Sequence, residues 1–229
     1  MQLKILSWNI WCDGDFEKVS SFLGACRADV IGLQEVVPGD RNRDIVSFLS
    51  TLGYEHSVAP IGAVFKDGRM ITTAIFSRYP ILTAKMHMLS EESRRQAAEA
   101  RIKVGNITLR VFSFHLLHTH QKESSVQNLQ IENLIKVLPK GKAIVMGDFN
   151  ATPEVTPIKR MREVLIDTDS ASTPTLNSHI FDCQECDRKL LDKTRLDYIF
   201  VSKDLKIHSF KVEKAQGSDH LPISVVVEA

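Results

Sequence analysis

Long apolar runs are missing from this sequence. No stretch approaches the roughly 18 apolar residues that a membrane-spanning helix needs, so we expect no integral membrane association. The opening residues, MQLKILSWNIWCDG, also lack the apolar core of a secretory signal. Cysteine is scarce, and Cys12, Cys26, Cys183 and Cys186 are too few and too scattered for a disulfide framework. Together these absences predict a cytoplasmic protein.

A strong net charge is missing as well. The 229 residues carry a formal charge of +1, so the surface as a whole offers no long-range attraction to nucleic acid or to an anionic membrane. An anionic substrate must therefore be bound by local groups. A basic track for nucleic acid would have to come from short clusters that are as easily explained as solvated faces: Arg41 with Arg43, Arg94 with Arg95, and Lys159 with Arg160 and Arg162.

Linkers and repeats are also absent. No segment rich in Pro, Gly or Ser divides the chain, and no internal period is visible. With 43% hydrophobic and 25% charged residues, the composition is that of an ordinary globular protein. We therefore predict one domain over residues 1–229, with a long loop at about residues 167–194, where no clear periodicity is found.

Apolar or alternating runs suited to strands are interspersed with segments of helical periodicity. The alternating run at residues 110–114 predicts a strand with one buried face, whereas residues 30–33 and 143–146 predict strands buried on both. This pattern predicts an α/β or α+β fold in which two sheets pack together with helices outside. Strands are expected at residues 3–8, 30–33, 74–76, 107–114, 143–146, 198–201, 207–212 and 223–227. Helices are expected at residues 16–26, 44–52, 125–138 and 158–165.

Polar residues follow several of these apolar runs. Asn9, Glu35 and His115 each end such a run, and AIVMGDFN ends at Asp148 and Asn150. Asp197, Asp219 and His220 border the last strands. Each residue alone is most simply a turn former or a helix cap. Together they supply four carboxylates, two imidazoles and two amides, which suit a hard divalent cation and a phosphate.

Six motifs occur in order along the chain: SWNIWCDG, LQEV, SFHL, GDFN, RLDYIF and GSDH. In this order and spacing they resemble the endonuclease/exonuclease/phosphatase superfamily, across residues 5–223. The family includes type I deoxyribonucleases, abasic-site endonucleases, sphingomyelinases and inositol polyphosphate 5-phosphatases. The resemblance implies a four-layered sandwich of two mixed β-sheets packed face to face and flanked by helices.

The resemblance also implies a metal site. Glu35 matches the principal metal-binding glutamate, and Asn9 matches an asparagine beside the metal. Asp148 and Asp219 are further expected ligands of Mg²⁺, for which Mn²⁺ would substitute. Asp148 is also expected to orient or deprotonate the attacking water, although His220 remains open as the general base. Because Asp148 and Asn150 are two residues apart, extended backbone would point both side chains the same way.

The remaining expected catalytic residues address the phosphate. In the family, Asn150 hydrogen-bonds a phosphate oxygen, and His115 donates to the phosphate or leaving group. Adjacent Asp219 and His220 should diverge, the carboxylate towards a metal and the imidazole towards the phosphate. Asp197 resembles the aspartate that pairs with this histidine and favours its charged form.

These features predict a Mg²⁺-dependent phosphodiesterase that acts by in-line attack of water, with a slight preference for a nucleic-acid or nucleotide-derived substrate. DNA and RNA are the candidate partners, and the motifs also suit tyrosyl-DNA phosphodiesterases. The alternatives are a phosphomonoesterase or lipid-headgroup hydrolase of the inositol phosphatase or sphingomyelinase type, and a non-catalytic binding relative. The oligomeric state is left open.

Two further histidine-containing patterns are weaker. Cys183 and Cys186, with His179 before them, could be a fragment of a zinc site, but no second ligand pair stands at a suitable spacing. His118 and His120 follow His115 closely and could line a cleft, although a solvated loop explains them more simply.

Overall fold

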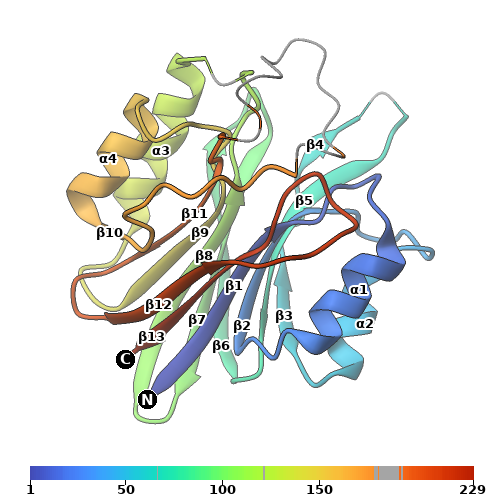
Figure 1. Ribbon diagram of the computed structural model, residues 1–229, viewed down its shortest axis with the longest axis horizontal. Helices are drawn as coiled ribbons and strands as arrows, with labels where there is room; N and C mark the ends of the chain where they lie inside the picture. The colour runs from blue at the N-terminus through green and yellow to red at the C-terminus, as the bar shows by residue number, and fades with distance from the viewer. Residues whose placement is uncertain (66, 121, 178–179, 181–190, 192) are drawn as a thin grey trace.

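The structure is a computed structural model that describes residues 1–65, 67–120, 122–177, 180, 191 and 193–229. Two mixed sheets lie face to face with two helices outside each of them (Figure 1). The four layers confirm the predicted α/β sandwich. Among the described residues, no helix is long and apolar enough to cross a membrane.

The first sheet has seven strands. Only β1 and β2 run parallel, and every other neighbouring pair in this sheet is antiparallel. The strands lie in the order β12 (Lys206–Val212), β13 (Ile223–Glu228), β1 (Gln2–Asn9), β2 (Val30–Val36), β5 (Met70–Ser77) and β3 (Glu55–Val58), and β4 (Ala63–Val64) pairs with β5.

The second sheet has six strands and a similar plan. Here β8 and β9 form the parallel pair, and the other pairs are antiparallel. The strands lie in the order β10 (Ile166–Asp167), β11 (Asp197–Val201), β9 (Ala143–Asp148), β8 (Ile107–His115), β7 (Arg95–Val104) and β6 (Ile81–Ser90). In each sheet, a helix connects the two parallel strands.

The helices begin where polar caps precede apolar periodicity. Asp15 accepts a hydrogen bond from Lys18 N at the start of α1 (Phe16–Ala25), and Asp44 accepts from Ser47 N at α2 (Ile45–Thr51). Ser124 accepts from Gln127 N at α3 (Ser125–Val137), whereas α4 (Thr156–Val164) has a proline in its first turn. These are standard helix-starting signals. The four helices agree with the prediction to within two residues.

Three apolar layers hold the sandwich together. Between the sheets, Ile5, Ile75, Val111 and Ile144 are fully buried with their neighbours. A second layer packs β1 and β2 on α1 and α2, and a third packs β8 and β9 on α3 and α4. Because β2 and β9 each contribute to two of these layers, they are buried on both faces as predicted.

The prediction for residues 110–114 was wrong in one respect. The strand alternates in sequence, but Val111 to Phe114 are all buried. Ser113 Oγ lies 2.7 Å from Thr73 Oγ1 and accepts a hydrogen bond from Gln34 Nε2 at 3.1 Å. The serine therefore joins the two sheets through a buried polar network, where alternation alone would place it in solvent.

Candidate active site

The first sheet delivers Asn9 and Glu35 from the ends of its parallel strands. Near Glu35, the register between β2 and β5 shifts, and its backbone is left-handed, with φ at +58°. Such a bulge re-aims a side chain. Glu35 Oε2 accepts from Cys12 N at 3.0 Å, and Asn9 Nδ2 donates to Glu35 Oε1 at 3.1 Å.

Asn9 also connects the two sheets. Its Nδ2 donates to Asp148 Oδ2 at 3.0 Å, while its Oδ1 accepts from Trp11 N at 3.0 Å. One buried amide thus holds the carboxylates of Glu35 and Asp148 beside each other. This arrangement suits a positioning role for Asn9, and its direct coordination of a metal stays a prediction.

The second sheet delivers His115 and Asp148 from its parallel strands and Asn150 just beyond them. His115 Nε2 lies 3.3 Å from Asp148 Oδ2 and 2.9 Å from Asn150 Nδ2. Asn150 is left-handed, with φ at +47°, and its N–H donates to Asp148 Oδ1 at 2.8 Å. The two side chains therefore meet through a turn, and the reason that we predicted, strand alternation, was wrong.

The GSDH segment approaches from the last connection. Trp8 Nε1 donates to His220 O at 2.9 Å, and Ser218 Oγ donates to Asn9 O at 2.7 Å, so the segment is fixed to the end of β1. His220 Nδ1 lies 2.8 Å from Asp197 Oδ2, and its Nε2 lies 3.7 Å from Asp148 Oδ2. The imidazole therefore stands between two carboxylates.

A cavity of about 260 Å³ collects most of these groups. Six of the eight predicted site residues line it: Glu35, His115, Asp148, Asn150, Asp219 and His220. Asn9 and Asp197 are buried directly behind this wall, at hydrogen-bond distance from Asp148 and His220 respectively. The structure thus brings all eight side chains into one site.

Neighbouring charges shift the pKa values of the buried His220 and Asp148. Burial favours a neutral imidazole, but the carboxylates of Asp197 and Asp148 raise the pKa of His220 well above its usual value. Burial likewise disfavours a charged Asp148, yet His220 and His115 hold the pKa of that carboxyl below its usual range. At neutral pH the pair is an imidazolium beside a carboxylate, which is suited to stabilising negative charge on a phosphate.

The pKa values of the other two cavity carboxylates, Glu35 and Asp219, are shifted in opposite directions. Burial would raise the pKa of Glu35, but His115 when charged, together with the Cys12 N–H and the Asn9 amide, holds it below its usual value. Burial raises the pKa of Asp219 to about 6, and the charges of Glu35 and Asp148 add to this effect. The positive charge of His220 offsets only part of this rise in the pKa of Asp219.

The donor set suits a hard divalent cation. Glu35, Asp148 and Asp219 present carboxylate oxygens to one cavity, the ligands that Mg²⁺ prefers. Asp148, Asp197 and His220 also offer ligand atoms within 4.8 Å of one another. Asp197 and His220 already bond to each other, and the metal-binding role of the three cavity carboxylates stays a prediction.

Arg95 and His118 also line the cavity. Arg95 Nε is buried and has no hydrogen-bond partner among the described residues, so the guanidinium can still bind an anion. His118 Nδ1 lies 2.9 Å from Asn150 Oδ1, and burial lowers its pKa. The sequence offered only the basic pair Arg94–Arg95 and the His-rich loop as signals, and a solvated loop was the wrong interpretation for His118.

Backbone strain is concentrated around the same cavity. Among the described residues, seven non-glycine positions have positive φ. Glu35 and Asn150 line the cavity, Arg94 precedes Arg95, and Trp11 follows Asn9 by two residues. Strain of this kind is characteristic of functional sites, which supports the cavity as the location of the chemistry.

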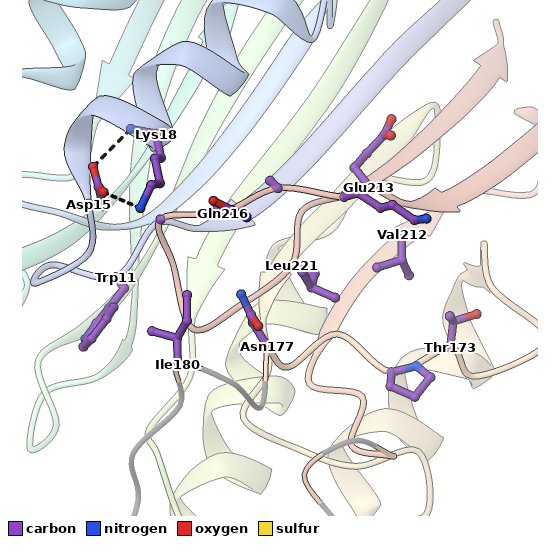
Figure 2. Close-up of a pocket in the computed structure, with 14 residues that line it drawn as sticks. Trp11, Asp15, Lys18, Thr173, Asn177, Ile180, Val212, Glu213, Gln216 and Leu221 are labelled. Carbon is purple, nitrogen blue, oxygen red and sulfur yellow. Dashed lines mark hydrogen bonds and ion pairs between the residues drawn. The ribbon is translucent and has the colours of Figure 1, made fainter.

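A larger cavity of about 960 Å³ lies beside the site and shares no lining residue with it. Figure 2 shows Trp11 and Ile180 at one end and Val212 and Thr173 at the other. The titratable groups that line it are an ion pair between Asp15 and Lys18, together with Glu213 and Lys214. None of the predicted site residues lines this larger cavity. Cys183, Cys186 and His179, the weak zinc candidate, lie outside the described residues.

Comparison with known proteins agrees with this geometry. The family model described as Endonuclease/Exonuclease/phosphatase family matches residues 6–220. The chain therefore belongs to the endonuclease/exonuclease/phosphatase family, and it is a hydrolase of phosphoric esters. A search of curated proteins found no match.

Several solved structures share the fold. An endonuclease/exonuclease/phosphatase from Beutenbergia cavernae is 19% identical, with 99% of this chain and 71% of that chain covered and a TM-score of 0.79. A mannosyl-6-phosphatase from Bacteroides thetaiotaomicron is 18% identical, with 99% and 100% covered and a TM-score of 0.75. TDP2 from D. rerio, complexed with single-strand DNA product, is 19% identical, with 100% and 99% covered and a TM-score of 0.77. At these identities the likeness concerns the fold alone.

Proposed function

We propose that the chain is a Mg²⁺-dependent phosphodiesterase that cleaves a phosphate ester by in-line attack of water, with a slight preference for a nucleic-acid or nucleotide-derived substrate. The observation that carries this proposal is the set of contacts around Asp148. This buried carboxylate touches the Asn9 amide and lies beside two imidazoles, those of His115 and His220. A carboxylate in such a position can orient a water molecule for attack.

The roles of the other side chains follow from their contacts. His220, held in its charged form by Asp197, would stabilise the negative charge that develops on the phosphorane. Asn150 Nδ2 and His115 Nε2 lie 2.9 Å apart. Both side chains would hydrogen-bond the phosphate or the leaving oxygen. The unpaired Nε–H of Arg95, which lines the same cavity, would bind the same anion.

A cation completes the proposal. Glu35, Asp148 and Asp219 would hold Mg²⁺, or Mn²⁺ in its place, with Asn9 fixing two of the three carboxylates. When bound, a divalent cation acts as a Lewis acid and lowers the pKa of water. The intact set of acidic residues argues against a non-catalytic binding relative, which would have no use for three carboxylates facing one cavity.

The remaining expectations are proposals of the same kind. We propose one catalytic domain over residues 1–229, because the site draws residues from both sheets and from both ends of the chain. We also propose a cytoplasmic location. The thiols of Cys12 and Cys26 are unpaired, in keeping with a reducing compartment.

The test is a substrate panel with the purified protein in Mg²⁺, in EDTA, and in EDTA followed by excess Mg²⁺. The panel contains single- and double-stranded DNA, abasic DNA, RNA, p-nitrophenyl phosphodiesters and monoesters, inositol phosphates and sphingomyelin. We expect cleavage of diesters that EDTA abolishes and Mg²⁺ restores. Cleavage of monoesters alone would overturn the diester assignment, and cleavage of sphingomyelin alone, itself a diester, would overturn the nucleic-acid preference.

Asp148→Asn tests the chemistry, because it removes the charge that orients water while keeping the shape. We expect kcat to fall about a thousandfold, with substrate binding largely kept. Asp204→Asn is the matched control, since Asp204 is exposed and does not line the cavity. Full activity in Asp148→Asn would refute the role of this residue.

A further inference from the structure

The cavity that holds the catalytic groups has a second, apolar side. Its polar wall carries the carboxylates, the imidazoles and Arg95, while its apolar wall is made of Ala63, Val64, Phe65 and Ile71. These residues belong to the hairpin in which β4 pairs with β5. A cavity that bound only a phosphate group would have no use for such a wall.

Two side chains of this wall are exposed to solvent. Val64 is 49% exposed and Phe65 is 41% exposed. Other large apolar side chains of the described residues are also exposed, among them Leu82 and Leu129, but none of those lines this cavity. Scattered exposed apolar residues need no explanation, whereas an adjacent pair at the mouth of an active site does.

The hairpin is braced against the body of the protein. Arg69 donates to Asp13 Oδ1 at 2.7 Å and to Cys12 O at 3.3 Å, next to the residues that hold Glu35. Thr72 Oγ1, at the base of the hairpin, contacts the carbonyls of Ala59 and Ile61 at 2.9 and 3.1 Å. The exposed pair is therefore held in place before any ligand arrives, which lowers the entropic cost of binding.

The ring of Phe65 favours a planar ligand. The Arg69 guanidinium lies over this ring at 5.9 Å from its centroid, within the range of a cation–π contact. The ring is 41% exposed, so a further planar group can stack on it. Two side chains offer too little surface to bury an acyl chain. An aromatic ring or a nucleobase, in contrast, needs only one flat contact, and stacking is tolerant of its identity.

We propose that Val64 and Phe65, which we call the apolar lip, bind a planar aromatic group, such as the nucleobase of a nucleoside whose sugar is esterified to the scissile phosphate. This rests on the proposed phosphodiesterase function and extends it to a substrate class. The polar wall holds the phosphate, and the apolar lip selects esters whose neighbouring group is flat and apolar. Simple sugar phosphates and alkyl esters gain nothing from this contact.

The test compares the dinucleotide TpT with its analogue that lacks both bases, and with two analogues of TpT that lack either base. The wild-type protein should prefer TpT over at least one of the base-free analogues by about tenfold or more in kcat/KM, mainly through KM. Phe65→Ala should lower kcat/KM for TpT about tenfold more than for the analogue that lacks both bases. Phe65→Trp, which keeps a flat ring, should retain the preference.

Leu82→Ala serves as the matched control, because Leu82 is 51% exposed on β6 and does not line the cavity. Its preference for TpT should equal that of the wild type. If the wild-type protein hydrolyses all four substrates with equal kcat/KM, or if Phe65→Ala lowers them all equally, the apolar lip has no such role although the enzyme is a phosphodiesterase. If none of the four is hydrolysed, the proposed function fails and the apolar lip proposal with it.

Discussion

The two sheets follow the same plan but bring different groups to the cavity. Each sheet has one parallel pair joined by a helix, β1 with β2 and β8 with β9. The first pair ends in Asn9 and Glu35, and the second ends in His115 and Asp148. The first pair thus supplies an amide and a carboxylate suited to a cation. The second supplies an imidazole and a carboxylate suited to a phosphate and its attacking water.

This difference shows how a rigid scaffold can divide a reaction between two halves. Parallel strands end at the same edge of a sheet, so each pair gives two side chains at fixed positions without a loop to place them. The single amide of Asn9 then joins the two halves by contacting one carboxylate from each sheet. Three experiments, described from the largest expected effect to the smallest, test this comparison of the two strand pairs.

His220→Ala should have the largest effect. It removes the positively charged imidazole that Asp197 and Asp148 stabilise. We therefore expect kcat to fall about a thousandfold, with little change in the affinity for the metal. Asp197→Asn, which leaves the imidazole but weakens its charged form, should cost less, about a hundredfold. Steady-state kinetics and Mn²⁺ titration give the two readouts, with exposed His56→Ala as a control. A loss of metal affinity as large as the loss of kcat would contradict the division.

Glu35→Gln should act on the half of the site that is suited to a metal ion. Loss of this carboxylate should weaken Mn²⁺ binding by at least the roughly 10- to 100-fold expected when a group that supports a metal ligand is removed. High Mg²⁺ should restore part of the activity, which it cannot do for His220→Ala. Titration followed by electron paramagnetic resonance measures the affinity, and exposed Glu91→Gln is the matched control. Unchanged affinity would remove Glu35 from the metal site.

The smallest expected effect concerns stability and compares one glycine in each parallel pair. A Cβ at Gly147 on β9 would lie 2.1 Å from the carbonyl oxygen of Phe114, which is backbone and cannot easily move. A Cβ at Gly32 on β2 would meet Met146, whose flexible end can shift. We expect Gly147→Ala to lower the free energy of unfolding by about 1–3 kcal/mol and Gly32→Ala by less. Urea denaturation measures both, and the reverse order would contradict this account.

Much of the fold could be predicted from the sequence because the central strands are strongly apolar. The strands β1, β2, β8 and β9 were all predicted, since their runs of Val, Ile, Leu and Phe leave little choice. The strand β7 was missed because its inward residues include Ala98 and Ala100, which give a weak apolar signal. The strand β6 was missed because it lies at an edge and is largely exposed.

The site was predictable to a similar extent. Residues carried by motifs at strand ends were named from the sequence, and the structure brings them together. Arg95 could not be found in this way, because its importance comes from burial beside Glu35 and Asp148, which one arginine in a basic pair does not reveal. The apolar lip was missed for the same reason, since exposure is a property of the folded surface and not of a local pattern.

The left-handed backbone at Glu35 has a consequence for how this site can change. A glutamate at φ of +58° sits in a conformation that glycine adopts without penalty and that other residues adopt at a cost of roughly 1–3 kcal/mol. The hydrogen bonds from Asn9 and Cys12 offset part of that cost only while a carboxylate is present to accept them. Replacing Glu35 by glycine would relieve this strain and abolish the carboxylate at once. Fold stability and catalytic turnover therefore place opposite demands on this one position.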